Sequence, residues 1–219
     1  EAEEVVKSIR IQIARGERDP REIAILFRTN EQPRVFEQEL RKHDIPYVIL
    51  GSKSFFDRKE VKDIVSYLRV LSNPQDEPSM RRIVNAPPRG ISNASVMKLI
   101  DVATERGVSL WEVMLDDEAL KILPVPARDA VRNFIELIRR GIKLFEERID
   151  AARLQQFITD CRYEKEVARN SNDDAEREMR WSSVEEVVNS VSSFTEKRTS
   201  PKLESFLEEI ALAASDMEE

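Results

Sequence analysis

Strand-like segments are confined to the first fifty residues of this chain. Residues 25–27 form a short apolar run, residues 47–50 form a second one, and a helical pattern lies between them. This order and spacing predict a small βαβ crossover with two parallel strands. Two strands do not make a stable parallel sheet, so either residues outside this chain complete the sheet or the strands pack in another way.

Polar side chains follow the first predicted strand. Arg28, Thr29 and Asn30 lie at its carboxyl end; Asn30 is a plausible N-cap, and Pro33 falls in the first turn of the next helix. Open α/β sheets bind phosphate-bearing ligands at such positions. An ordinary strand, turn and helix with a solvated arginine explains the same residues, and both interpretations stay open at this point.

The pattern after residue 51 is helical throughout. Apolar residues recur at helical spacing from Arg58 to Ser72 and then in a series of further helices that reaches residue 212. The residues Asn170–Glu178 predict a loop or connection. Gly141 lies inside a long predicted helix and lowers the helix propensity there. The composition changes near Asn85–Arg89, with α/β before it and helix after it. We therefore predict a mostly α fold with a small parallel α/β part.

Composition restricts the chemistry. The only cysteine, Cys161, cannot form an internal disulfide, which fits a reducing, cytoplasmic setting, and with His43 as the only histidine a Cys/His zinc site is excluded. Neither a signal peptide nor an apolar run of membrane-spanning length is present. The net charge of −7 argues against simple electrostatic binding of nucleic acid, unless the basic residues gather on one face. The lack of an initiator Met suggests a piece of a longer protein.

Two segments could carry a function, although no Gly-x-x-x-x-Gly-Lys-Ser/Thr phosphate loop is present. Residues 54–63 open a helix that Asp57 is expected to cap, and their charges read as local surface ion pairs, Lys59 with Asp63 among them. Residues 87–92 form a rigid turn before a helix. This turn either offers backbone N–H groups and Arg89 to a phosphate or acts as a domain hinge.

Several motifs in this order resemble the UvrD/PcrA/Rep family of superfamily 1 DNA helicases. The resemblance covers nearly the whole chain, and its specificity comes from the ordered set rather than from any one block. The motifs that carry it are ILFRTNEQPRVFE at 25–37, FFDRKEVKD at 55–63 with YLR at 67–69, NP at 73–74, RIVNAPPRGI at 82–91 and LESFLEEIAL at 203–212.

The resemblance implies a place within such an enzyme. Residues 1–85 look like the start of the second RecA-like motor domain, of the P-loop NTPase type and incomplete here. Residues 86–200 look like its all-helical insertion domain, and residues 201–219 look like a helix that returns to the motor. The missing strands of the sheet would then come from a segment that follows this chain.

The resemblance also suggests DNA-contact residues. Arg28, Thr29 and Asn30 match positions that touch the translocated single strand, while Arg89, Gly90 and Ile91 match the contact to the duplex backbone. Pro88 stands where the family often has Lys, and Ser92 stands where a second Gly is usual. These departures remove one positive charge and some backbone freedom from the duplex contact.

The implied function is that of a 3′-to-5′ DNA helicase driven by ATP and Mg²⁺ in the intact enzyme. The ATP-binding motifs are absent, so we expect this fragment to bind no cofactor and to be inactive alone. Implied partners are a single-strand/duplex junction and repair or replication proteins that bind the helical domain. A non-catalytic helical protein-interaction module is the rival, and a nuclease-fused parent is a further option. A basic surface that spans Arg28, Arg58, Lys62 and Arg89 would favour the helicase.

Overall fold

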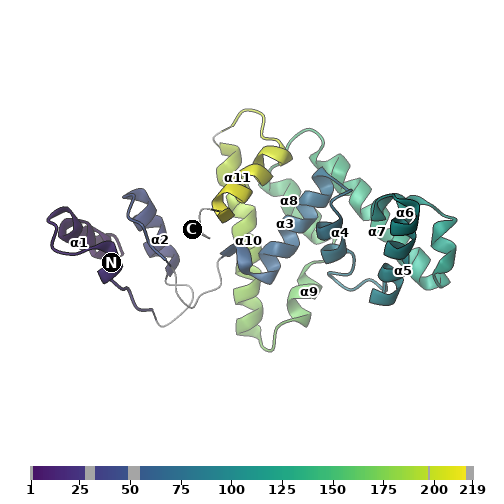
Figure 1. Ribbon diagram of the computed structural model, residues 1–219, viewed down its shortest axis with the longest axis horizontal. Coiled ribbons are helices and arrows are strands. Elements are labelled where there is room, and N and C mark those ends of the chain that lie inside the picture. The colour runs from purple at the N-terminus through teal and green to yellow at the C-terminus, as the bar shows by residue number, and fades with distance from the viewer. Residues whose placement is uncertain (1, 28–32, 49–54, 197, 216–219) are drawn as a thin grey trace. The chain divides into compact units, whose positions relative to one another are not determined.

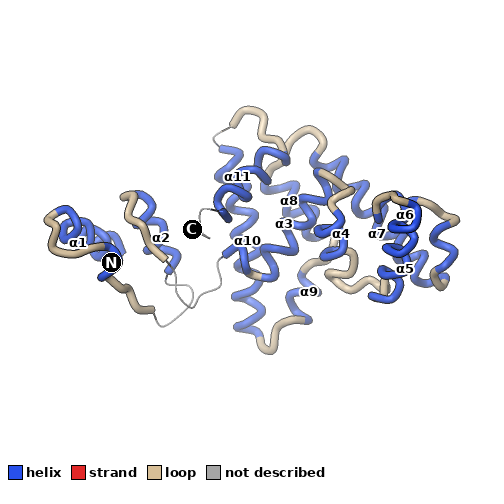
Figure 2. The backbone as a smooth tube through the Cα atoms, in the orientation of Figure 1, coloured by secondary structure: helices blue, strands red, loops and turns tan. Residues whose placement is uncertain are grey.

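The computed structural model describes residues 2–27, 33–48, 55–196 and 198–215. The chain divides into two compact units, unit 1 (Glu1–Ser54) and unit 2 (Phe55–Glu219), which we describe separately. Within the described residues every regular element is a helix (Figures 1 and 2). None of these helices combines the length and the apolar character that crossing a bilayer requires.

Unit 1 is built on two helices. Its elements are α1 (Ala2–Ala14), the 3₁₀ turn η1 (Pro20–Glu22) and α2 (Pro33–Lys42), and α1 packs on α2. Its core consists of Val6, Ile9, Leu40 and Ile45, with Ile13, Ile23, Ile25, Phe36 and Tyr47 packed against it. The predicted stop of the first helix at Gly16 is confirmed, because the Gly16 amide donates to the carbonyl of Ile13 and its φ is 68°.

The prediction of two parallel strands is wrong for the part of them that the structure describes. Residues 23–27 and 45–48 lie in loops, while the ends of both predicted strands fall outside the described residues. Leu26 is 93% exposed and Val48 is 79% exposed. A parallel strand needs a hydrogen-bonded neighbouring strand, and neither segment has one among the described residues. The apolar pattern is present, but within the described residues no sheet buries it.

Unit 2 is entirely helical over its described residues. Its elements are η2 (Phe55–Asp57), α3 (Lys59–Ser72), α4 (Glu77–Ile83), α5 (Asn93–Arg106), α6 (Leu110–Leu115), η3 (Ala119–Ile122), α7 (Val125–Phe145), α8 (Ala151–Asp160), α9 (Glu164–Arg169), α10 (Asp174–Glu196) and α11 (Leu203–Ser215). Helix α3 lies at the centre and packs against α4, α7, α10 and α11. Because α3 buries side chains around most of its circumference, with Lys62 and Arg69 exposed, it acts as the axis of the unit.

The domain boundary that we predict near residue 85 falls inside unit 2. It stays a prediction about the domains of a parent protein. As a compact body, unit 2 already begins at Phe55, because α3 buries its side chains in the same core as the helices that follow.

Local signals explain most helix ends. Gly107 ends α5 with a φ of 65°, and Ser109 with Glu112 forms the predicted capping box of α6. Two predictions are wrong. Asp57 does not cap α3, whose N-cap is Arg58 without a side-chain bond. The predicted loop at 170–178 is shorter, because α10 already begins at Asp174.

Helix α7 continues through Gly141 without a break. A Cβ atom on Gly141 would lie 2.6 Å from Leu71 Cδ2 and 2.6 Å from Phe157 Cε2. The missing side chain therefore lets α3 and α8 approach the backbone of α7 closely. This packing gain explains why a residue of low helix propensity stands in the middle of a long helix.

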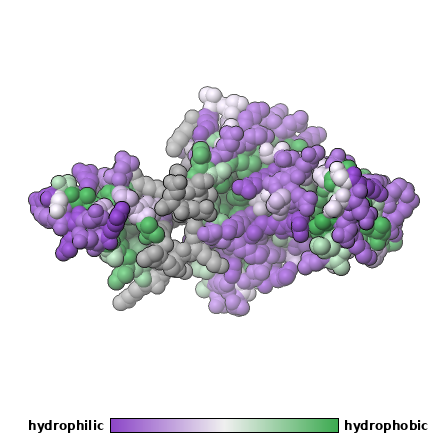
Figure 3. Space-filling view, viewed as in Figure 1, coloured by the Kyte–Doolittle hydropathy of each residue, from purple (hydrophilic) through white to green (hydrophobic). Residues whose placement is uncertain are grey.

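An apolar hollow of about 160 Å³ opens on the surface of unit 2. Its lining comes from η2, α3, α10 and α11, with the residues Phe55, Phe56, Val61, Val65, Val187, Ser190, Phe206, Glu209 and Ile210. Figure 3 shows apolar surface in the region of α10 and α11, and further apolar surface near α5 and α6.

Candidate nucleic-acid interface

The predicted single-strand contacts Arg28, Thr29 and Asn30 lie outside the described residues. The structure does describe the residues on either side of them. The Phe27 ring lies 5.3 Å from the Phe36 ring of α2, measured between centroids. The roles assigned to the three residues stay a prediction.

The predicted duplex contact lies in the 85–92 turn, the segment of residues 85–92 between α4 and α5. The side-chain oxygen of Asn85 accepts a hydrogen bond from the Arg89 amide at 3.0 Å, which closes the turn. Gly90 is exposed with a φ of 87°, a conformation that favours glycine, whereas Ile91 is fully buried. Ser92 then caps α5 by accepting from the Ser95 amide. The turn is thus fixed at both ends, while Pro88, Gly90 and Ser92 are exposed.

The Arg89 side chain is directed into unit 2. Its Nη1 donates to the carbonyl oxygens of Ile83 at 2.8 Å and Val84 at 3.1 Å, and its Nη2 donates to the Tyr67 hydroxyl at 2.7 Å. Its Cζ lies 4.9 Å from the centroid of the Phe134 ring. These bonds satisfy two carbonyls at the C-terminal end of α4, and the aromatic contact adds a cation–π attraction.

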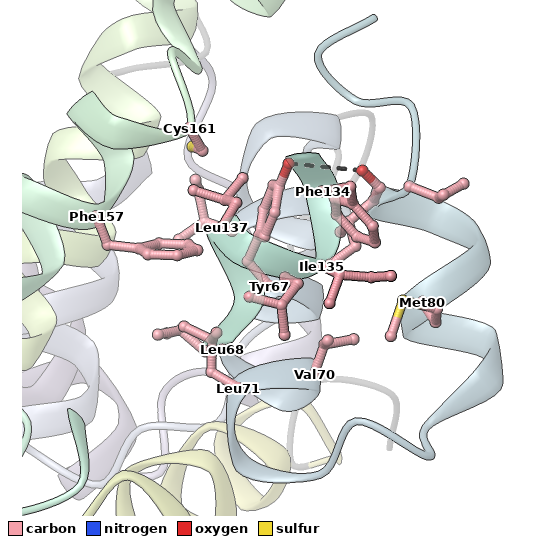
Figure 4. Packing of buried hydrophobic residues seen from close by; sticks show 14 of the residues in the cluster. Tyr67, Leu68, Val70, Leu71, Met80, Phe134, Ile135, Leu137, Phe157 and Cys161 are labelled. Carbon is pink, nitrogen blue, oxygen red and sulfur yellow. Dashed lines mark hydrogen bonds between the residues drawn. The ribbon is translucent and has the colours of Figure 1, made fainter. Parts of the chain in front are cut away.

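Tyr67 connects α3 to the same turn. Its hydroxyl donates to the carbonyl oxygen of Ala86 at 2.6 Å. Its ring packs edge-on against Phe157 with centroids 5.5 Å apart (Figure 4). Burial raises the pKa of Tyr67, although Arg89 opposes the rise, so the hydroxyl stays protonated and can donate. The motif-based reasoning missed Tyr67 as a partner of this turn. The available signal was a tyrosine within an otherwise apolar stripe, because a buried hydroxyl needs a partner.

A second polar cluster, the α3 ion network, lies at the start of α3. Asp63 is 1% exposed and accepts from Lys59 Nζ at 2.9 Å, Arg82 Nε at 2.7 Å and the Tyr163 hydroxyl at 2.7 Å. Lys59 also donates to Glu166 at 2.6 Å. The predicted pair of Lys59 and Asp63 is confirmed. Its interpretation as a surface pair is wrong, because the network joins α3 to α4 and α9.

Burial and hydrogen bonding act in opposite directions on the charges of this network. Burial alone would lower the pKa of Lys59, but hydrogen bonds to Glu166 and Asp63 raise it above its ordinary value. Burial alone would raise the pKa of Glu166, but hydrogen bonds from Lys59 and Asn170 lower it. Both groups are therefore held in their charged forms near neutral pH.

The predicted basic surface needs four cations, Arg28, Arg58, Lys62 and Arg89. Arg58 donates to Ser183 Oγ at 2.9 Å, Lys62 pairs with Asp57 at 2.7 Å, and Arg89 is engaged as described above. The three that the structure describes are each bonded to protein groups rather than gathered as an open basic patch. The described cations therefore give no additional support for DNA binding.

Comparison with known proteins decides the family. The model of the UvrD-like helicase C-terminal domain matches residues 1–219, the whole chain. The chain belongs to this family. The resemblance found in the sequence motifs is thereby confirmed.

Relatives of this UvrD-like domain include bacterial proteins named ATP-dependent DNA helicase PcrA. The protein from Bacillus subtilis is 33% identical over 199 residues, which cover 91% of this chain and 26% of the relative. The proteins from Staphylococcus epidermidis and Staphylococcus aureus are 39% and 36% identical over 143 residues, or 65% of this chain and 19% of each relative. The chain thus spans about a fifth to a quarter of the length of these relatives.

The described residues do not form a site for ATP and Mg²⁺. The sequence has no phosphate loop, and over the described residues no group of three or more His, Cys, Asp or Glu side chains is arranged to hold a metal ion. The carboxylates of the α3 ion network are already bonded to Lys, Arg and Tyr side chains. We therefore derive no catalytic step from this chain.

Proposed function

We propose that this UvrD-like domain is part of an ATP-dependent DNA helicase that moves 3′ to 5′ on single-stranded DNA and unwinds duplex. In this proposal the chain supplies DNA-contact and regulatory regions, while ATP and Mg²⁺ act elsewhere in the intact enzyme. The observation that carries the proposal is the family match over all 219 residues, together with relatives named as ATP-dependent DNA helicases.

The proposal assigns two DNA contacts. Arg28, Thr29 and Asn30 would touch the single strand, with Arg28 on a phosphate and Asn30 on a sugar or phosphate oxygen. The 85–92 turn, with Arg89, Gly90 and Ile91, would meet the duplex backbone. The rigid closure of this turn by Asn85 and the exposure of Gly90 support the second assignment.

The larger assignments are also part of this proposal. Residues 1–85 would belong to a motor domain, residues 86–200 to the helical insertion and residues 201–219 to the returning helix. Repair or replication proteins are the proposed partners of the helical part, in a cytoplasmic setting.

The test is salt-dependent binding of the 219-residue chain to a fluorescent single-strand/duplex junction. Binding should be weak and should fall steeply with salt. Arg28→Ala should reduce the slope of log K against log salt concentration by about 1, which is the effect of one lost phosphate contact. Arg18→Ala is the matched control, because Arg18 is an exposed arginine in the same unit. Absence of binding at low salt would contradict the assignment of DNA contacts to this chain.

The rival proposal is a helical module that binds protein partners. Two observations favour it, namely the net charge of −7 and the apolar hollow lined by Phe55, Phe56 and Phe206. If the folded chain does not bind DNA at any salt concentration, the result would support this rival.

A further inference from the structure

We infer that Arg89 is a positioning residue, which holds the 85–92 turn in shape together with Tyr67, and that the turn meets a phosphate through its backbone rather than through the Arg89 guanidinium. The inference rests on the proposed function, because it specifies how the proposed duplex contact is made. It also changes the role that the sequence motif suggested for Arg89.

The bonds of the guanidinium carry the argument. Nη1 is shared between the carbonyls of Ile83 and Val84, and Nη2 is bonded to the Tyr67 hydroxyl. To reach a phosphate in solvent, Arg89 would have to leave these carbonyls and the face of Phe134. The carbonyl of Ile83, a fully buried residue, would then lose its charged donor, which is a costly exchange.

Tyr67 makes the arrangement cooperative. Its hydroxyl accepts from Arg89 and donates to the carbonyl of Ala86, so one chain of hydrogen bonds runs from the guanidinium back to the turn. The Asn85 side chain adds a bond to the Arg89 amide. The turn is therefore bonded at its backbone from two sides, and its conformation depends on the fork shape of the Arg89 side chain as well as on its charge.

Besides Pro88, which has no amide proton, and Ser92, which caps α5, the exposed residue of the turn is Gly90. It is exposed, its φ is 87°, and within the described residues its amide donates no hydrogen bond to the protein. A turn amide free of internal bonds can donate to a phosphate oxygen. Pro88, at the position where the family often has Lys, brings neither a charge nor an amide proton, so the backbone at Gly90 is the donor best placed to replace it.

The first arm of the experiment needs no DNA. Amide NMR spectra of the chain are compared for Arg89→Lys, Tyr67→Phe and the control Arg81→Lys, which changes an exposed arginine on α4. We expect Arg89→Lys and Tyr67→Phe to shift the same amides, those of Gly90 and Ile91, while Arg81→Lys leaves them in place. Unchanged Gly90 and Ile91 amides in a folded Arg89→Lys variant would overturn the inference.

The second arm measures binding to the DNA junction. A positioning role predicts that Arg89→Lys weakens binding about tenfold although it keeps the charge, and that Tyr67→Phe weakens it about threefold. A direct phosphate contact predicts instead that Tyr67→Phe binds like wild type, because the guanidinium that would hold the phosphate is still present. If the unmodified chain does not bind the junction, the proposed function fails in this respect, while the amide shifts still decide the role of Arg89.

Discussion

Unit 1 and unit 2 both carry apolar patterns, but they bury them to very different degrees. The described core of unit 1 consists of Val6, Ile9, Leu40 and Ile45, whereas unit 2 encloses a continuous core around α3. Helices bond their own backbone, so they need only an apolar partner face. Strands must bond to neighbouring strands. The comparison teaches that a helical unit can complete itself within one stretch of chain, while a unit with a strand pattern depends on which other segments are present.

The largest expected effect is on unit 2 alone. Asp63→Ala should lower its free energy of unfolding by about 3–5 kcal/mol, because Lys59, Arg82 and Tyr163 would lose a buried acceptor. Denaturant unfolding followed by tryptophan fluorescence measures this directly, since Trp111 and Trp181 are the only tryptophans and both lie in unit 2.

Asp101→Ala is the matched control for this change, because Asp101 is an exposed aspartate on α5. Hydrogen exchange in α1 should stay the same in both variants. If Asp63→Ala also speeds hydrogen exchange in α1, the two units do not unfold independently. This result would contradict the treatment of unit 2 as a body that completes itself.

A smaller loss is expected where α7 meets its neighbours. Gly141→Ala should destabilise unit 2 by about 1–3 kcal/mol, because the added Cβ would overlap Leu71 and Phe157. Asn133→Ala, at an exposed position of the same helix, should be neutral or slightly stabilising, as helix propensity alone predicts. Thermal unfolding of both variants compares the two effects. A more stable Gly141→Ala protein would show that the close approach is not required.

The pH dependence of unit 2 should come next in size. The pKa of Glu166 is lowered in the folded state, mainly by hydrogen bonds from Lys59 and Asn170 that outweigh burial. Its contribution to stability is therefore present above the ordinary carboxyl pKa of 4.5 and is lost as the pH falls through the lower folded pKa. Unit 2 should lose stability as the pH falls below about 4.5.

Melting temperatures measured over this acid range test the assignment. Glu166→Gln should have a lower melting temperature near neutral pH but a flatter pH dependence than wild type. Glu164→Gln, which changes an exposed carboxylate on the same helix, is the control. An unaltered pH profile in Glu166→Gln would assign the acid sensitivity to other carboxylates.

The smallest effect is expected in unit 1. Leu26→Ser should change stability by no more than about 0.5 kcal/mol, since the side chain is 93% exposed. Leu40→Ala, at a position only 7% exposed, should cost about 2 kcal/mol or more and serves as the positive control. Hydrogen exchange of the α1 and α2 amides measures the stability of unit 1 in both variants. A large loss in Leu26→Ser would show that the exposed residue packs in solution, as a strand would require.

Local chemistry was readable from the sequence at several helix ends. The stop at Gly16, the capping box of Ser109 and Glu112 and the Lys59–Asp63 pair depend on residues at most four positions apart, so their geometry follows from helix periodicity. The ordered motifs likewise sufficed to identify the family, which the match over all 219 residues confirms.

Two errors arise within a few residues, and a third depends on distant parts of the chain. Asp57 was expected to cap α3, but it pairs with Lys62 while Arg58 takes the cap position. Residues 170–178 were expected to form a loop, but the Asp173 side chain accepts from the Glu176 amide and α10 starts early. The α3 ion network joins residues about a hundred positions apart, which no local pattern contains.

Residue types and spacings thus determined most of the helices and the rigid turn at residues 87–92, and the ordered motifs identified the family by resemblance. Tertiary structure decided that Arg89 points inward to Tyr67, that the start of α3 is buried, and that the described parts of the two predicted strands lie in loops. The physical reason is the range of the interactions. Helix formation and capping are settled within a few residues, whereas burial, ion pairing and sheet formation depend on which distant segments of the chain come into contact.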